Sequence, residues 1–192
     1  MKRKGWFVIP GVQEGERTLE EQMTGIMPAL EEAASKTVLD LGCAEGLIGR
    51  EFAHAGAAKV IGVESLRWHI EVGREQCAGL PIVFHQAYLD EYALAMMAMP
   101  DMPQFDIVLS LGVCHKLQEP QIGIRYSAMA ARELCLIRFP ARPDSQGGLI
   151  RGKHFKNNTC DVPATMAQLG FELERTEPGP REEMVHYWRR KR

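Results

Sequence analysis

The sequence lacks the features that would place the protein in a membrane or on a polyanion. None of its apolar runs reaches the roughly 20 residues that a membrane-spanning helix needs. Its 23 Lys and Arg residues are balanced by 25 Asp and Glu residues, and a pI near 6.3 supplies no general attraction to DNA, RNA or an anionic bilayer. The apolar stretch after the basic start is only four residues long before Pro10, too short for a secretory signal. We therefore expect a soluble, cytoplasmic protein without a membrane or DNA partner.

Paired metal and redox ligands are also missing. The five cysteines form an odd set without a Cys-x-x-Cys pair, which predicts reduced thiols and no disulfide framework. The six histidines contain no His-x-x-x-His or His-Glu-x-x-His pattern that would set two imidazoles on one helical face. The sequence thus predicts no metal site.

The most informative feature that is present is a strand that ends in a glycine-rich turn. Thr37–Leu41 runs into Gly42-Cys43-Ala44-Glu45-Gly46 and then into a helical pattern. Glycines let the backbone approach a ligand where a side chain would block it, and a helix start presents unpaired N–H groups. The next apolar run, Val60–Val63, ends on Glu64, whose carboxylate can accept both hydroxyls of a ribose. The two segments predict a nucleoside-cofactor site at the carboxyl ends of adjacent parallel strands.

The turn does not carry the dinucleotide fingerprint Gly-x-Gly-x-x-Gly. Counting from Gly42, Ala44 and Leu47 stand where the second and third glycines are needed. Asp40 lies two residues before Gly42, where a carboxylate can accept from a cationic amino-acid group lying across the turn. S-adenosylmethionine joins an adenosine to a methionine ammonium, so it suits Asp40 and Glu64 better than a nicotinamide dinucleotide does.

The stretch from Asp40 to Gly46 resembles the first motif of the class I S-adenosylmethionine-dependent methyltransferases, Asp-x-Gly-x-Gly-x-Gly, with only the middle glycine replaced by alanine. Glu64 is similar to the acidic residue with which the family holds the ribose. It stands 24 positions after Asp40, close to the roughly 20 residues expected in such units. Phe105–His115 resembles the family's fourth-strand segment, which opens toward the transferred methyl group. The resemblance implies S-adenosylmethionine as cofactor, S-adenosylhomocysteine as product, and cofactor contacts from Asp40, Gly42, Cys43, Ala44, Glu45, Gly46, Glu64, Ser65, Gln86, Ala87, Tyr88, Ser110 and Leu111.

Several of these residues have an alternative role that the sequence leaves open. Glu45 either contacts the cofactor or only complements the dipole of the helix that follows it. Cys43 is either a cofactor neighbour or a small packed residue. The family often places Gly-Asp where Ala87-Tyr88 stands, and its Asp contacts the adenine. Here adenine is held by stacking on Tyr88, by Gln86 or by backbone groups alone.

Strand patterns alternate with helical patterns along the chain. Strands are expected near 37–41, 59–63, 82–84, 105–110 and 133–139, and helices at about 46–55, 66–76, 88–97 and 119–131. This order predicts βαβ units with right-handed crossovers, and therefore an α/β fold with a doubly wound, mostly parallel sheet. The tail adds a helix near 161–169 and two alternating runs around Pro178-Gly179-Pro180. Those runs predict a C-terminal antiparallel hairpin that completes a seven-stranded sheet similar to that of the family.

The length of 192 residues suits one sizeable core, so we expect a single methyltransferase domain over 1–192. Residues 1–36 are expected to form an N-terminal cap and a helix over 18–34. The cofactor-binding core is expected over 37–140, and a loop, a helix and the closing hairpin over 141–192.

Candidate acceptor contacts lie in three places. His115 follows the fourth strand, where it acts as a general base if the acceptor loses a proton, or else packs as a structural histidine. Trp6 belongs to the 6–18 segment, where family members often build a cap over the acceptor pocket. Arg138 and Arg142 begin a long Gly/Pro-rich loop that either binds an anionic acceptor or only solvates the surface.

We expect methyl transfer to an oxygen or nitrogen of a small or medium-sized molecule. RNA is the alternative acceptor, since the 6–18 segment is similar over a short length to the lead-in of enzymes that modify the wobble uridine of transfer RNA. The Asn/Asp-Pro-Pro-Tyr/Phe pattern that holds a flipped base is absent after the fourth strand, which argues against base methylation of that type. A non-catalytic partner subunit that keeps the cofactor fold is a third alternative.

Overall fold

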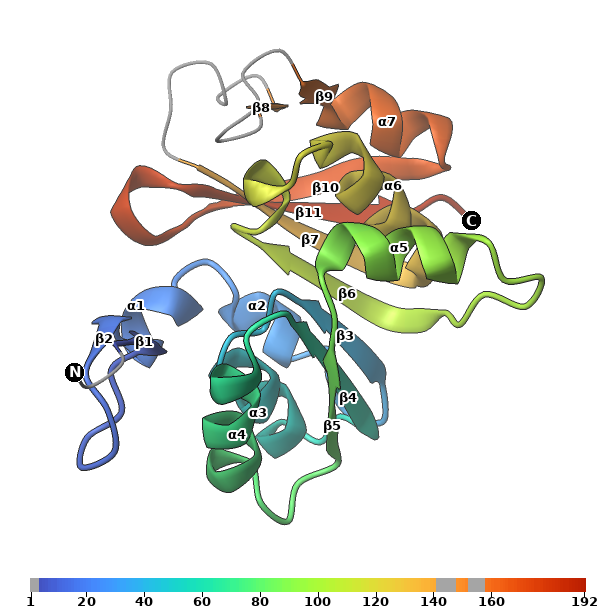
Figure 1. Ribbon diagram of the computed structural model, residues 1–192. Helices are drawn as coiled ribbons and strands as arrows, with labels where there is room; N and C mark the ends of the chain where they lie inside the picture. The colour runs from blue at the N-terminus through green and yellow to red at the C-terminus, as the bar shows by residue number, and fades with distance from the viewer. Residues whose placement is uncertain (1–3, 141–147, 152–157) are drawn as a thin grey trace.

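A seven-stranded sheet organises the computed structural model of the protein, which describes residues 4–140, 148–151 and 158–192 (Figure 1). The strand order is β10-β11-β7-β6-β3-β4-β5. The parallel strands are β3 (Thr37–Leu41), β4 (Lys59–Glu64), β5 (Ile82–Gln86), β6 (Phe105–Leu111) and β7 (Ala131–Phe139). An antiparallel hairpin of β10 (Phe171–Pro178) and β11 (Met184–Arg190) joins the sheet at β7. The predicted α/β fold with a closing hairpin is confirmed.

Helices cover both faces of this sheet (Figure 1). One face carries α5 (Leu89–Met97), α6 (Pro120–Ala130) and α7 (Val162–Gln168), and the other carries α3 (Leu47–His54) and α4 (Arg67–Gln76). Each face has its own apolar core. Along β7, Leu134 and Leu136 belong to one core, whereas Cys135 and Ile137 belong to the other, as the period of two in a strand requires. Burial on both faces explains why these strands are almost continuously apolar.

The prediction of one continuous helix over 18–34 is wrong, because the structure has two short helices there. The chain forms α1 (Leu19–Met23) and α2 (Met27–Leu30), separated at Gly25, whose φ is +77°. A Cβ at Gly25 would collide with the carbonyl oxygen of Pro178 in the closing hairpin. The hydroxyl of Tyr187 also donates to the Gly25 carbonyl at 2.8 Å. Tertiary contact with the hairpin therefore breaks the helical pattern at this glycine.

The cap, residues 4–17, contains two short strands that the sequence does not signal. β1 (Gly5–Phe7) pairs in parallel with β2 (Gly15–Arg17), and Phe7 is buried in the core on the α3 side. Four further elements are short: β8 (Leu149–Arg151), β9 (Thr159–Asp161) and the 3-10 turns η1 (Cys114–Lys116) and η3 (Pro180–Glu182). In the described part of the chain, no helix is long and apolar enough to cross a membrane.

Candidate active site

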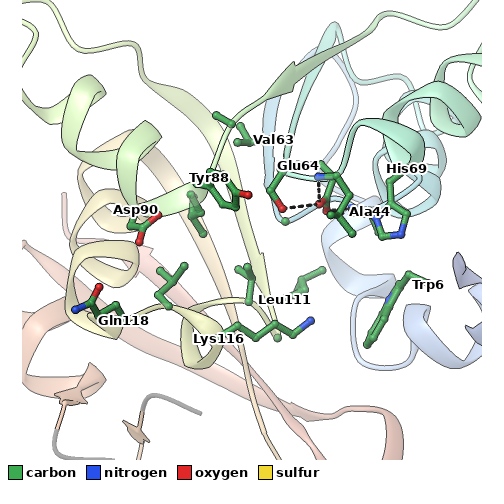
Figure 2. A pocket seen from close by; sticks show the side chains of 18 residues that line it. Trp6, Ala44, Val63, Glu64, His69, Tyr88, Asp90, Leu111, Lys116 and Gln118 are labelled. Carbon is green, nitrogen blue, oxygen red and sulfur yellow. Dashed lines mark hydrogen bonds and ion pairs between the residues drawn. The ribbon is translucent and has the colours of Figure 1, made fainter. Parts of the chain in front are cut away.

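A cavity of about 480 Å³ opens at the carboxyl ends of β3, β4, β5 and β6. Residues at or just after these strand ends line it, namely Gly42, Glu64, Ala87 and Leu111. Trp6 of the cap stands at one side of the cavity (Figure 2). Strand order reverses between β3 and β6, and ligands of open α/β sheets bind at such a switch point. The volume is that of a small-molecule pocket, and we call this cavity the main pocket.

The turn after β3 depends on left-handed backbone. Gly42 has φ +71° and Gly46 φ +70°. A Cβ on Gly42 would lie 2.6 Å from the Val113 side chain, and one on Gly46 would lie 2.6 Å from the Phe84 ring. Only glycine fits either position. Ala44 between them also has a positive φ, +49°, so alanine here accepts a conformation that costs a side-chain-bearing residue roughly 1–2 kcal/mol.

The carboxylate of Glu64 lies in the wall of the main pocket, next to this turn (Figure 2). Its Oε2 accepts from the Ala44 amide at 3.0 Å, and its Oε1 accepts from the Leu66 amide at 2.9 Å and the Ser65 hydroxyl at 3.1 Å. Burial raises the pKa of Glu64, but the His69 ring and the Leu66 amide lower it further, so that its net pKa lies below the ordinary value. Glu64 is thus held as an oriented anion that can accept hydroxyl groups from a ligand.

Asp40 lies deeper, near the end of β3, and is only 3% exposed. Its Oδ2 has no hydrogen-bond partner among the described residues. Asp40 lines a second cavity of about 20 Å³ that shares Trp6, Gly42 and Leu111 with the main pocket. Burial raises the pKa of Asp40 to about 7, although the nearby Arg138 guanidinium lowers it. A buried carboxylate with an unused oxygen is suited to a cationic ligand group that would restore its charge.

The structure brings together many of the residues predicted from sequence. The main pocket is lined by Trp6, Gly42, Ala44, Glu64, Ser65, Ala87, Tyr88 and Leu111. The smaller cavity adds Asp40, Cys43 and Arg138. Five predicted residues line neither cavity, namely Glu45, Gly46, Gln86, Ser110 and His115.

The side chains outside the two cavities have other surroundings. Glu45 is fully buried and accepts from the amides of Trp6 and Phe7 in the cap. Ser110 is buried with its Oγ 2.9 Å from the Cys114 sulfur. Gln86 is exposed, and its Nε2 donates to the Ser65 carbonyl at 3.4 Å. His115 is half-buried in η1, beside the pocket-lining Lys116.

The sequence places Arg138 at the start of a loop that meets the acceptor, whereas the structure has it before that loop. Arg138 lies within β7 and is 3% exposed. Its guanidinium donates to the Oε1 of Gln22 at 2.6 Å and to the Leu111 carbonyl at 3.3 Å, and its Nε lies 3.2 Å from the Glu183 carboxylate. These partners join α1, β6 and the closing hairpin, so the side chain is committed to packing. Arg142 lies outside the described residues.

Four polar residues that line the main pocket were not predicted from the sequence: His69, Asp90, Lys116 and Gln118. Asp90 stands two residues after Tyr88, in the first turn of α5. Lys116 lies with its Nζ 4.6 Å from the centre of the Trp6 ring, a cation–π distance. Figure 2 shows this lysine extending across the pocket toward Trp6. No local pattern marks Lys116 or Gln118, because Lys116 ends the short 3-10 turn η1 and Gln118 follows it in irregular chain.

Comparisons with known proteins agree with this geometry. A family model described as a methyltransferase domain matches residues 38–132. The tRNA U34 carboxymethyltransferase of Edwardsiella ictaluri is 27% identical over 160 residues, which make up 80% of this chain and 48% of that protein. The enzyme of the same name from Sodalis glossinidius is 24% identical over 178 residues, 88% of this chain and 53% of that protein. The chain thus spans about half the length of these curated relatives.

Solved structures share the fold at lower identity. A crystal structure of magnesium protoporphyrin IX methyltransferase from Synechocystis PCC 6803 with bound SAH superimposes with a TM-score of 0.64 at 16% identity, covering 93% of this chain and 90% of that one. The match to the methyltransferase domain agrees with three features of the structure. These are the glycine turn after β3, the carboxylate at the end of β4 and the reversed closing hairpin. Residues 38–132 of this chain therefore match a methyltransferase domain, and the chain shares the fold of solved methyltransferases that bind S-adenosylmethionine or its product.

Proposed function

We propose that the protein transfers a methyl group from S-adenosylmethionine, bound in the main pocket, to an oxygen or nitrogen of a small or medium-sized acceptor. The observation that carries this is the pair of carboxylates beside the glycine turn. Glu64 is an oriented anion in the pocket wall, and Asp40 has an unused buried oxygen in the adjoining cavity. Glu64 suits the ribose hydroxyls, and Asp40 suits the ammonium of the methionine end.

Asp90 is the best candidate for the adenine end. It lines the main pocket on the wall opposite Glu64 (Figure 2), and a carboxylate there can accept from an exocyclic amine. Tyr88 stands beside it and is 63% exposed, with a ring face available for stacking. Together these residues address three separate parts of the cofactor, which fixes its orientation.

The chain's own contribution to the reaction is alignment and exclusion of water. When bound, S-adenosylmethionine supplies an electrophilic methyl group with its leaving group already built in. Leu111, Val113 and Leu117 give the β6 side of the pocket an apolar lining, where an acceptor atom is held without competing water. Orientation of this kind can account for several kcal/mol of a displacement barrier. The sequence predicts His115 as the base for acceptors that must lose a proton, but this residue lines neither cavity.

The basic residues near the C-terminus do not extend the main pocket into an RNA-binding surface. Arg189 and Arg190 lie at the end of β11 that pairs with the start of β10, so they are at the sheet edge opposite the main pocket. Arg189 is paired with Glu32 and Glu174, and Arg190 donates to backbone carbonyls. These side chains are therefore committed and distant from the pocket, and they offer no phosphate-binding track to its mouth.

RNA is the second candidate acceptor, and the two curated relatives favour it. Both are named for action on tRNA U34, and the match to each covers 80% or more of this chain. In this version a single nucleotide would enter the main pocket beside Trp6 and Lys116, and a partner would hold the rest of the RNA.

Calorimetric titration with S-adenosylhomocysteine tests the cofactor assignment. Glu64→Gln should weaken binding at least tenfold, because the oriented anion is lost. Glu71→Gln is the matched control, since Glu71 on α4 is exposed and pairs only with Arg67 among the described residues, and it should change affinity less than twofold. Equal effects of the two variants, or tighter binding of NADH, would contradict the assignment.

Transfer of a labelled methyl group from S-adenosylmethionine then tests the acceptor. The protein is incubated with a small-molecule cell extract and, separately, with total RNA. Label in the small-molecule fraction supports the first candidate, and ribonuclease-sensitive label supports the second. Cofactor binding without transfer to either fraction would favour the non-catalytic partner subunit.

A further inference from the structure

The cap is fastened to the glycine turn by one buried carboxylate. Glu45, with no exposed surface, accepts from the Trp6 amide at 3.0 Å, the Phe7 amide at 3.2 Å and the Gln13 side-chain amide at 2.7 Å. Charge-assisted hydrogen bonds in a buried setting are among the stronger polar contacts. The position of Trp6 at the main pocket is therefore set by Glu45, which is 39 residues away in sequence.

His69 lies between this carboxylate and the one proposed to hold the ribose. Its Nε2 is 3.5 Å from the Oε1 of Glu45, and its Nδ1 is 3.8 Å from the Oε2 of Glu64. The ring is 8% exposed and packs edge-on against Trp68, with ring centres 3.9 Å apart. Figure 2 shows His69 on the same wall as Glu64, directly above Trp6. A rigidly packed ring between two carboxylates connects the cofactor site to the cap anchor.

We propose that His69 is a positioning residue that links occupancy of the Glu64 site to the placement of the cap, so that cofactor binding fixes Trp6 over the main pocket. The inference rests on the proposed cofactor position at Glu64. The Oε2 of Glu64 faces His69 and already accepts from the Ala44 amide. Ligand hydroxyl groups that arrive at Glu64 therefore compete with His69 for this oxygen. The His69 Nδ1 makes no hydrogen bond among the described residues, and once hydroxyl groups occupy Glu64 the imidazole keeps its proton on Nε2, which faces Glu45 at 3.5 Å. Donation from Nε2 to Glu45 then strengthens the hold on the cap.

Such a link is reciprocal. If cofactor binding stabilises the cap, then loosening the cap must weaken cofactor binding by the same factor. A ring that served only to fill space would transmit no such effect. The linkage also orders the reaction, since the acceptor side of the pocket is completed by Trp6 only after the cofactor has bound.

A double-mutant cycle on S-adenosylhomocysteine binding measures this coupling. Gln13→Ala removes the bond from the cap side chain to Glu45, together with a bond from the same Nε2 to the Phe7 carbonyl, and Gln13 lines neither cavity. It should weaken binding about three- to tenfold when His69 is present and less than 1.5-fold in the His69→Asn background, because residues in one network are non-additive. Asn is too short to span both carboxylates, and His69→Ala is the second background should His69→Asn fail to fold.

Hydrogen exchange supplies a readout that a packing role would not move. S-adenosylhomocysteine should slow exchange of the Trp6 and Phe7 amides in the unaltered protein and leave it unchanged in His69→Asn. His54→Asn, an exposed position at the end of α3, should behave as the unaltered protein in both experiments.

The outcomes separate the link from the cofactor assignment. An equal loss from Gln13→Ala in both backgrounds, no loss in either, or protection of the cap amides that persists in His69→Asn would each overturn the link. Loss of affinity in Glu64→Gln would still support the cofactor position in all three cases. If Glu64→Gln left affinity unchanged, the proposed cofactor position itself would fall.

Discussion

Asp40 should make cofactor binding depend on pH in a range where most carboxylates do not titrate. Burial raises its pKa to about 7, so that in the free protein it is half protonated at neutral pH. A ligand ammonium binds the ionised form and draws the pKa of Asp40 down. Affinity is therefore greatest above pH 7 and falls by up to tenfold for each pH unit below it.

The magnitude follows from the ionised fraction. With a pKa of about 7 for Asp40, lowering the pH from 7.5 to 5.5 should raise the dissociation constant of S-adenosylhomocysteine about 25-fold, or about 1.9 kcal/mol. Glu64 does not contribute to this slope, because its pKa is already below the ordinary value. An amino group of the ligand stays largely protonated across most of this range.

Calorimetry across this pH range is the assay, with one variant and one ligand as controls. Asp40→Asn should bind more weakly at pH 7.5 and show little change of affinity down to pH 5.5. 5′-Methylthioadenosine, which has the ribose and adenine but no ammonium, should also lack most of the slope. A dissociation constant for S-adenosylhomocysteine that changes less than twofold, or a slope retained in Asp40→Asn, would refute the proposed contact.

Three further predictions concern neighbouring residues. Asp90→Asn should weaken S-adenosylhomocysteine binding about three- to tenfold by calorimetry and narrow the preference for adenosine over inosine ligands; an unchanged preference would place adenine elsewhere. Ala44→Gly should raise the free energy of unfolding in urea by about 0.5 kcal/mol. Glycine relieves a left-handed strain of roughly 1–2 kcal/mol, and its greater chain entropy in the unfolded state partly offsets this gain. A loss of stability would show that Ala44 is unstrained at φ +49°. Arg138→Met should lower the free energy of unfolding by roughly 3 kcal/mol, because Gln22 and Glu183 lose a buried partner; a change below 1 kcal/mol would mean that these contacts are replaceable.

The sheet could be predicted because its strands carry local signals. β3 and β4 are buried on both faces and end at a glycine turn and a carboxylate, so their bounds, Thr37–Leu41 and Lys59–Glu64, agree with the sequence pattern within a residue. β1 and β2 could not be predicted, because three-residue strands have no measurable periodicity. Their stability comes from Glu45, whose partners lie 32 to 39 positions away.

The site was predictable only in part, for a similar reason. The motif shows where a turn lies but not which way each side chain faces. Glu45 sits between Ala44 and Gly46, which both have positive φ, so the chain reverses on each side of it and the carboxylate faces the cap. Arg138 looked like a free cation on sequence grounds, but its acceptor Gln22 is 116 residues away. Long-range partners of this kind leave no trace in a local pattern.

The placement of Glu45 bears on how this turn works without its middle glycine. In a turn held only by its own backbone, alanine at position 44 would destabilise the fold without any compensating contact. Here the Ala44 amide donates to Glu64, and the next residue anchors the cap through three hydrogen bonds. Ala44, the strained residue, therefore lies between Glu64, which is proposed to hold the cofactor, and Glu45, which anchors the cap. The contacts of Glu64 and Glu45 hold Ala44 in its left-handed conformation, so the strain is tolerated. The same contacts fix the cap relative to the Glu64 wall of the main pocket.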